Sequence, residues 1–508
     1  MNSDLHSALR AYEQIVRAVP HDIHALCAVG KSLHQFNRPQ ETRKCYKAAV
    51  ELLQRATRAG DANAALYIEH MIVIHFVRTI EDENHYYRCF ADWRDDLAKL
   101  GRRLRNTEGP RGDPCRIAFF LHTGYILGHT DVLFKMLENV PADRRASIVP
   151  RIYVLEKYAH DFMARAQKIG IEVILIEDFV PAGNAVNFLE KFLYLRDRLR
   201  QDDMGVCVWV SAPAAAAFAL SMRLAPVQIF WALRFHPVTC PAIDGYITYG
   251  ARDEQERVFG KQKWRVCPVP LAIEAAASAP AGEITRLRAR FPEPVLLGTL
   301  SREEKIDSEP FLKSVASILI NNPQAGYLWT GRTEHPRIRK FFEQAGVAQR
   351  CHYVGWVDTK FYVAALDVFL ETFPLGCGVT GYQALSAGVP LLSILEKNTV
   401  FGMQFWHRIM PHGRTAAAPG PPPATNLGEF PILCARDMDD YVALAGRLIS
   451  DAGFRAAVGA RGQTFFQEEL ANGAADSNRF FDTIRAIADT TPGTGRSASA
   501  ANATQTSA

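Results

Sequence analysis

The chain has 508 residues, of which 48% are apolar and 22% are charged. At roughly 100–200 residues per domain, this length predicts about three to four domains with substantial cores. The net charge is only +4, and such a near-neutral balance argues against a dedicated nucleic-acid-binding protein.

The ten cysteines form no Cys-x-x-Cys pair and no cluster with histidine. The sequence therefore predicts neither a disulfide framework nor a metal site, and we expect buried, reduced thiols. The N-terminus lacks the basic segment and apolar run of a secretion signal. The longest apolar run, Val206–Met222, is shorter than the roughly 20 residues that cross a bilayer and predicts a strand followed by a buried helix. We expect a cytoplasmic protein with no integral membrane segment.

Residues 1–108 have the periodicity of helices. Ala8-x-x-x-Tyr12 recurs 34 residues later as Thr42-x-x-x-Tyr46, and Gly30 lies between them where a helical hairpin would pack. This pattern is similar to the tetratricopeptide repeat, in which a small residue lets paired helices approach and an aromatic side chain fills the gap between neighbours. The match covers about one and a half repeat units. An ordinary helical bundle without peptide-binding use is the alternative interpretation.

From residue 115 the sequence changes to short apolar runs that alternate with longer amphipathic ones. This alternation predicts parallel sheets with helices on both faces. The predicted strands form two series, 116–121, 148–155, 171–176, 206–210, 227–233 and 246–248, and then 295–300, 327–330, 352–354, 368–370, 390–394 and 431–434.

A segment rich in Ala, Gly and Pro at 272–282 separates the two series and predicts a linker. Two doubly wound domains in tandem would place their ligand-binding strand ends across a cleft from one another. We therefore predict an α/β fold with an all-helical domain at 1–108, Rossmann-like domains at 115–275 and 283–489, and a disordered tail at 490–508.

Residues 371–381, Glu-Thr-Phe-Pro-Leu-Gly-Cys-Gly-Val-Thr-Gly, follow a predicted strand and precede a predicted helix. A glycine-bearing loop that enters a helix leaves backbone N–H groups unpaired beside the positive end of the helix dipole. This arrangement suits a diphosphate, to which Thr380 can add its hydroxyl group. The alternative is that the glycines only turn the chain between strand and helix.

A second candidate phosphate-binding segment, residues 298–305, follows the first strand of the same domain. It brings Arg302 and Lys305 to the same sheet edge, where Lys305 can neutralise charge on a departing diphosphate. A solvated lysine paired with Glu303 or Glu304 is the alternative. Neither segment is a Walker loop and no Gly-x-Gly-x-x-Gly opens either domain, which disfavours a nucleoside triphosphatase and a dehydrogenase.

These segments resemble the cytosolic protein glycosyltransferases that comprise the O-GlcNAc transferases and the bacterial adhesin N-glucosyltransferases. Leu370–Gly376 with Thr380-Gly381 is close to a Leu-Asp-Thr-Phe-Pro-Phe-Gly motif of the N-glucosyltransferases. Their His-Pro-Ala-Thr-Thr stretch and Ile-Asp-Tyr are similar to Ala225-Pro226-Val227-Gln228, His236-Pro237-Val238-Thr239 and Ile243-Asp244. Gly128-His129-Thr130 is similar to a Gly-Asn-His segment of the O-GlcNAc enzymes. The resemblance spans about residues 116–470.

The resemblance implies a GT-B fold and transfer of a sugar from a UDP-sugar, with inversion and without a metal ion or other cofactor. His129 and His236 would face the acceptor or the sugar, where an imidazole that titrates near neutrality suits a general base. Without the resemblance, a structural role would be the default for a lone histidine. The positions implied for donor binding are Thr299, Arg302, Lys305, Tyr353, Gly355, Trp356, Gly376, Gly378, Val379, Thr380, Gly381 and Gln383.

Two positions depart from the family pattern. Gln383 stands where the family carries an aspartate that binds the ribose hydroxyls, and Glu371 replaces another aspartate. A neutral glutamine binds a hydroxyl group more weakly than a carboxylate does. The sequence therefore leaves open whether donor binding is impaired.

We expect an enzyme that attaches glucose or N-acetylglucosamine to Asn, Ser or Thr side chains of a protein such as a surface adhesin or appendage. Residues 1–108 would contribute to binding the polypeptide. One alternative is a GT-B transferase with a glycan or lipid acceptor, because acceptor choice lies in loops and not in the fold. The other is a catalytically weak, tetratricopeptide-like interaction scaffold, which the Gln383 departure supports.

Overall fold

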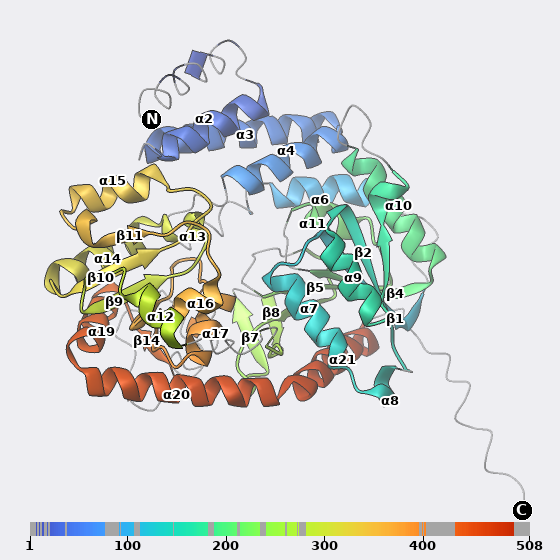
Figure 1. The fold of residues 1–508 in the computed structure, drawn as a ribbon. Coiled ribbons are helices and arrows are strands. Elements are labelled where there is room, and N and C mark those ends of the chain that lie inside the picture. Colours follow the sequence, from blue (N-terminus) through green and yellow to red (C-terminus); the bar gives the residue numbers. More distant parts are fainter. Residues whose placement is uncertain are drawn as a thin grey trace, which may run out of the picture.

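The computed structural model describes three packed units, shown in Figure 1. Apart from a few single positions, the described residues are 21–35, 38–76, 93–105, 112–145, 147–180, 187–210, 214–233, 240–259, 262–271, 281–395, 401–402 and 432–491. The predicted tail at 490–508 lies almost entirely outside these residues. None of the helices within them is both long enough and apolar enough to cross a membrane.

The first unit is all-helical, as predicted. Its helices are α2 (Ile23–Gln35), α3 (Pro39–Ala59), α4 (Ala62–His75) and α6 (Arg94–Arg103). A Cβ atom at Gly30 would overlap the ring of Phe76, and the rings of Tyr46 and Phe76 lie 5.9 Å apart. The close approach at a small residue beside aromatic rings is the packing that the tetratricopeptide-like pattern predicts.

The helical unit shares a core with the first α/β domain. Leu97 and Leu100 of α6 belong to the same buried apolar cluster as Phe218 and Leu220 of α11. A Cβ atom at Gly101 would overlap the carbonyl oxygen of Phe218. The two units are therefore joined by continuous packing and not by a linker alone.

The first α/β domain contains one eight-stranded sheet in the order β3-β2-β1-β4-β5-β6-β8-β7, parallel except for β7. The strands are β1 (Asp113–Gly124), β2 (Val149–Tyr158), β3 (Glu172–Leu175), β4 (Met204–Val210), β5 (Val227–Ala232), β6 (Gly245–Thr248), β7 (Glu256–Phe259) and β8 (Gln262–Val266). The helices are α7 (Gly128–Glu138), α8 (Ala142–Arg145), α9 (His160–Lys168), η2 (Ile176–Asp178), α10 (Phe188–Gln201) and α11 (Ala216–Ser221). All six predicted strands are present, and the run that includes β4 and the buried α11 confirms the strand and helix predicted within 206–222. The β7–β8 hairpin was not predicted.

The second α/β domain has a parallel six-stranded sheet in the order β11-β10-β9-β12-β13-β14. The strands, all predicted, are β9 (Val295–Thr299), β10 (Ala325–Trp329), β11 (Cys351–Tyr353), β12 (Val368–Leu370), β13 (Leu391–Ile394) and β14 (Leu433–Ala435). The helices are α12 (Ala281–Arg288), α13 (Glu303–Ile306), α14 (Glu309–Asn321), α15 (Pro336–Gln344), η3 (Ala348–Arg350), α16 (Thr359–Val363), α17 (Val379–Ser386), α19 (Met438–Ser450) and α20 (Ala452–Ala471).

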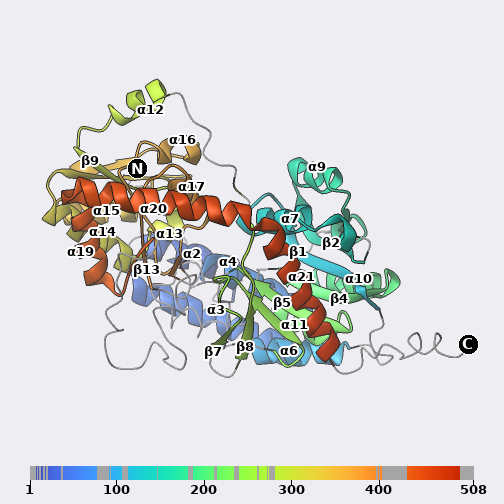
Figure 2. The same cartoon turned by 90° about the horizontal axis from the view of Figure 1, so that it is seen from below.

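The last helix, α21 (Gly473–Thr490), belongs to the first α/β domain. Figure 2 shows α20 crossing from the second domain to the first, where α21 continues. Phe480 and Phe481 enter the core of the first sheet, and the ring centroids of Trp231 and Phe480 lie 4.5 Å apart. Helix α21, almost all of which lies within the predicted range 283–489, therefore covers with its apolar face a sheet that is distant in sequence.

Candidate functional site

Loops after neighbouring parallel strands meet at one edge of the second sheet. The strand order β11-β10-β9-β12 places the four following loops in the same order, because the carboxyl ends of parallel strands share an edge. The backbone N–H of Gly331 donates to the carbonyl of Gly355 at 3.3 Å. The N–H of Arg332 in turn donates to the carboxylate of Glu303 at 2.9 Å. This edge is the one on which the predicted donor-binding residues were expected.

Lys305 lies in α13, a single helical turn after β9. Its Nζ atom donates to the carbonyl oxygen of Gly376 at 2.6 Å, which ties the turn after β9 to the glycine-bearing loop after β12. The side chain is half-buried. The structure thus brings together the two segments that the sequence singled out for phosphate binding, with a positive charge between them.

The glycine-bearing loop enters α17 at Gly378, whose φ of 69° and ψ of −116° suit glycine and not residues with a Cβ atom. The first turn of α17 leaves backbone N–H groups without intrahelical acceptors at the positive end of the helix dipole. Two buried oxygens, Thr380 Oγ1 and Gln383 Oε1, have no hydrogen-bond partner of good geometry among the described residues. Buried polar atoms are normally satisfied, so these two oxygens stand out as acceptors at the beginning of α17.

The beginning of α7 in the first domain faces the beginning of α17. A Cβ atom at Gly128 would lie 3.6 Å from Cγ2 of Val379. His129, the next residue, is half-buried within the first turn of α7. Because Gly128 and Val379 adjoin His129 and Gly378, the structure brings one of the two predicted histidines close to the glycine-bearing loop.

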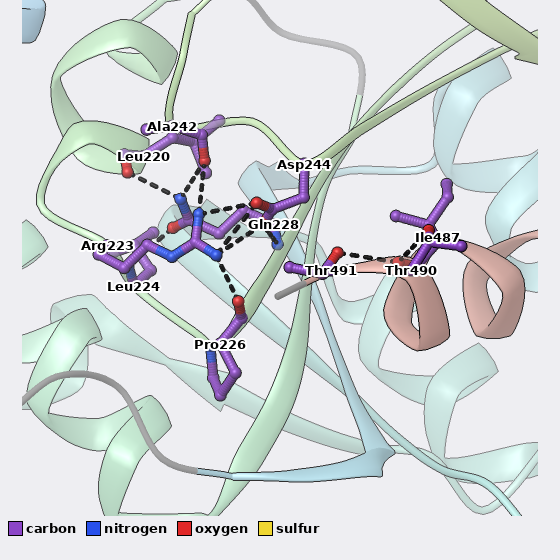
Figure 3. Close-up of polar contacts among 10 residues, drawn as sticks. All are labelled: Leu220, Arg223, Leu224, Pro226, Gln228, Ala242, Asp244, Ile487, Thr490 and Thr491. Atoms are coloured by element: carbon purple, nitrogen blue, oxygen red, sulfur yellow. Dashed lines mark hydrogen bonds and ion pairs between the residues drawn. The ribbon is translucent and has the colours of Figure 1, made fainter. Parts of the chain in front are cut away.

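The second predicted histidine, His236, lies outside the described residues, but the segments on both sides of it are well placed. Figure 3 shows Arg223, Gln228 and Asp244 joined in one polar network. The backbone N–H of Gln228 donates to Asp244 at 2.8 Å, and the Gln228 amide donates to the carbonyl of Ala242 at 2.7 Å. The residues that carried the family resemblance here therefore anchor β5 and β6, the strands that precede and follow His236 in the sequence.

Other predicted donor-binding residues have structural contacts of their own. Thr299 is fully buried and donates to the carbonyl of Leu370 at 2.9 Å. The Tyr353 hydroxyl donates to the carbonyl of Gly331 at 2.9 Å. Gly381 packs against Phe401, whose ring a Cβ atom would meet at 2.5 Å. These positions hold the sheet edge and its loops in shape.

Two predicted residues are more accessible. Trp356 is 63% exposed, and the guanidinium of Arg332 lies 5.6 Å from its ring centroid. Arg302 is half-buried at the N-terminal cap of α13. Gly355 has a φ of 78°, a left-handed conformation that gives glycine an advantage beside Trp356.

Two carboxylates of the second domain, those of Glu371 and Asp437, have structural partners. Glu371 is fully buried and accepts a hydrogen bond of 2.5 Å from the Ser393 hydroxyl. Asp437 caps α19 by accepting from the N–H of Asp440 at 2.8 Å. In the part of the chain that the structure describes, no three His, Cys, Asp or Glu side chains are grouped to hold a metal ion.

Sequence reasoning missed the polar residues that join the units. Glu69 of α4 is buried, and its two carboxylate oxygens accept from Trp93 Nε1 at 3.0 Å and from the N–H of Ala215 at 2.8 Å. Burial raises the pKa of Glu69 to about 7, although the two hydrogen bonds lower it. Burial lowers the pKa of His122 to about 3, helped by the nearby His70. Neither residue lies in a motif, so no sequence pattern predicts these contacts.

No family model and no curated protein matches the chain. Among solved structures, a mutant O-GlcNAc transferase from Thermobaculum terrenum is similar over 95% of this chain and 94% of its own, with a TM-score of 0.58 and 15% sequence identity. HepE of Anabaena, in complex with UDP and glucose, matches over 73% of this chain and 99% of its own, with a TM-score of 0.51 and 12% identity. The first likeness covers nearly the whole chain, with its helical N-terminal unit. The chain therefore has a two-domain GT-B fold preceded by a helical domain.

Proposed function

We propose that the chain is a glycosyltransferase that moves a hexose, glucose or N-acetylglucosamine, from a UDP-sugar to an Asn, Ser or Thr side chain of a protein. The observation that carries the proposal is the Lys305–Gly376 contact beside the N-terminus of α17. Glycines, helix N–H groups and a lysine together suit a diphosphate. The fold shared with a structure that contains UDP and glucose supports a UDP-sugar donor.

The proposed reaction is a single displacement. The acceptor nitrogen or oxygen attacks the anomeric carbon from the face opposite UDP, so that the bond to the diphosphate oxygen breaks and the configuration inverts. The electron pair of that bond leaves with UDP, and the acceptor loses its proton to a base. Lys305 and the N-terminus of α17 would stabilise the charge that develops on the leaving diphosphate. In this role they would replace a divalent cation.

His129 is the candidate on the acceptor side. It belongs to the first domain, and its neighbour Gly128 adjoins Val379 of the donor-side loop. An imidazole in this position suits a general base or an orienting hydrogen bond to the acceptor. His236, which lies between β5 and β6 in the sequence, has the same proposed role. A polypeptide acceptor is supported by the helical domain, since helical hairpins can hold an extended chain.

Gln383 is proposed to hydrogen-bond the ribose of the donor. It is 5% exposed, and its Oε1 has no partner among the described residues. As an amide oxygen it can accept from a ribose hydroxyl, though more weakly than a carboxylate. A buried amide oxygen without a protein partner at this position favours a donor-binding enzyme over an interaction scaffold that no longer binds the donor.

The test combines the purified protein with UDP-glucose or UDP-N-acetylglucosamine, with and without a cellular protein extract, and measures released UDP. Mass spectrometry of the extract then looks for a hexose or N-acetylhexosamine on Asn, Ser or Thr peptides. The proposal expects UDP release that rises with the extract, together with modified peptides. UDP release with modified glycans or lipids instead would identify the alternative GT-B activity. The absence of both release and UDP binding would favour the interaction scaffold.

A further inference from the structure

A polar contact joins the helical domain to the turn that carries Lys305. His34, near the end of α2, has its Nε2 atom 3.1 Å from Oδ2 of Asp307. Asp307 caps the C-terminus of α13, two residues beyond Lys305. The contact therefore links the first unit of the chain directly to a part of the proposed donor site.

Asp307 is buried, and its two carboxylate oxygens have different partners. Oδ1 accepts from Nη1 of Arg337, whereas Oδ2 faces His34. The Nδ1 atom of His335 lies 3.6 Å from Oδ2, beyond hydrogen-bonding distance. Burial by itself would raise the pKa of Asp307, but the hydrogen bond from His34 and the charges of His335 and Arg337 together hold it below its usual value. The carboxylate is thus ionised, and His34 is the hydrogen-bonding group that the structure places at Oδ2.

The turn between Glu303 and Asp307 depends on outside contacts. A helix of four residues is too short to be stable alone. Glu303 fixes one end by accepting from the N–H of Arg332 at 2.9 Å. Asp307 fixes the other end, where its N–H also donates to the carbonyl of Glu303 at 2.8 Å. Lys305 lies between these two ends, so losing the contacts of Asp307 would make the position of the Lys305 side chain less defined.

The helical domain is held firmly on its other side. Glu69 of α4 accepts from the N–H of Ala215 in the first α/β domain at 2.8 Å. Gly101 of α6 packs directly on the backbone at Phe218. The first α/β domain therefore fixes the position of α2, and the contact of His34 with Asp307 joins α2 to the second α/β domain.

We propose that His34 is a positioning residue: through Asp307 it aligns Lys305 with the first α/β domain across the domain interface. This inference rests on the proposed function, in which Lys305 contacts the donor diphosphate. The role of His34 is to hold a buried carboxylate in place, and it touches neither donor nor acceptor. The helical domain would thereby act on donor binding as well as on the acceptor.

The experiment compares His34→Ala and His34→Gln with wild type and with His24→Ala. His24 is a matched control because it lies on the same helix, is exposed, and bonds within the helical domain to the Tyr67 hydroxyl at 2.7 Å. UDP affinity is measured by calorimetry. Hydrogen exchange of residues 303–308 is followed without nucleotide, with residues 116–121 of β1 as the internal reference.

We expect His34→Ala to weaken UDP binding about fivefold, less than the full effect of losing a hydrogen bond to a charged group, because the loss reaches Lys305 only through the turn. Exchange should become faster at 303–308 but not at 116–121. His34→Gln should restore most of the UDP affinity and most of the protection from exchange at 303–308, because its amide can donate to Asp307. His24→Ala should match wild type in both measurements. Equal UDP affinity and equal exchange in His34→Ala and wild type would overturn the proposal, as would equal losses in His34→Ala and His24→Ala. If wild type binds no UDP, the proposed function fails, while local exchange at 303–308 still decides whether His34 holds the turn.

Discussion

The buried carboxylate of Glu69 gives the structure a stability that depends on pH in a predictable direction. Its side chain joins α4 to Trp93 and to the backbone of Ala215, and burial raises its pKa from 4.5 to about 7. A group whose pKa is higher in the folded state stabilises the fold below its unfolded pKa and loses that contribution as pH rises through the folded pKa. For Glu69 the loss falls between pH 4.5 and about 7.

The magnitude follows from the size of the shift. A rise of roughly 2.5 units at 1.36 kcal/mol per unit corresponds to about 3 kcal/mol of unfolding free energy. The substitution Glu69→Gln removes this titration and replaces one acceptor oxygen with an NH₂ group. One of the two N–H donors then loses its acceptor, which costs about 1–3 kcal/mol. The variant should therefore be less stable than wild type at pH 5, and equal to it or more stable at pH 8, where wild type has lost the stability that comes from the raised pKa of Glu69.

The assay is urea unfolding at pH 5, 6, 7 and 8 for wild type, Glu69→Gln and the control Glu51→Gln, whose side chain is 64% exposed. The informative quantity is the difference between Glu69→Gln and wild type. Buried His122 acts in the opposite direction: because its pKa is lowered to about 3, the protein loses stability as pH falls from 6.5 toward that value. This contribution is the same in both proteins and cancels in the difference. We expect the stability of wild type relative to Glu69→Gln to fall by about 2.5 kcal/mol from pH 5 to pH 8, so that the difference reaches zero or changes sign. A difference that stays constant with pH would refute the reasoning.

Three further predictions concern the glycines and the metal. Gly378→Ala forces a side chain into a backbone conformation with φ of 69°, so UDP affinity should fall about fivefold or more, whereas Gly388→Ala, at the other end of α17, should leave it unchanged. Gly101→Ala should lower the melting temperature, because the new methyl group overlaps the Phe218 carbonyl and such overpacking costs about 1–3 kcal/mol; Gly282→Ala, which meets nothing within 4 Å, is the control. Sugar transfer should survive excess EDTA, and complete loss restored by manganese would contradict the proposed charge stabilisation by Lys305.

The strands and the two phosphate-binding candidates could be predicted because their signals are local. Each strand is a short apolar run, and the loops with Lys305 and Gly378 directly follow such runs. A doubly wound topology then requires loops after neighbouring strands to meet at one edge. The Lys305–Gly376 contact is the result of that rule.

The features that the sequence did not reveal depend on contacts between distant segments. Helix α21 has an ordinary amphipathic pattern, and nothing local shows that Phe480 packs on the first sheet. Glu69 and His34 are single polar residues on helices, where the usual expectation is a solvated side chain. Their partners, Ala215 and Asp307, become visible only when three units are packed together.

Calorimetry with UDP on wild type and Lys305→Ala tests the central claim most directly. Lys313→Ala is the matched control, since Lys313 is an exposed lysine of the adjacent helix α14 that pairs with Glu309 at 2.7 Å. We predict that wild type and Lys313→Ala bind UDP equally, and that Lys305→Ala binds at least tenfold more weakly, about 1.4 kcal/mol for one charge-assisted contact. Equal UDP affinity in all three proteins would contradict the assignment of the donor site to Lys305 and the loop at Gly376.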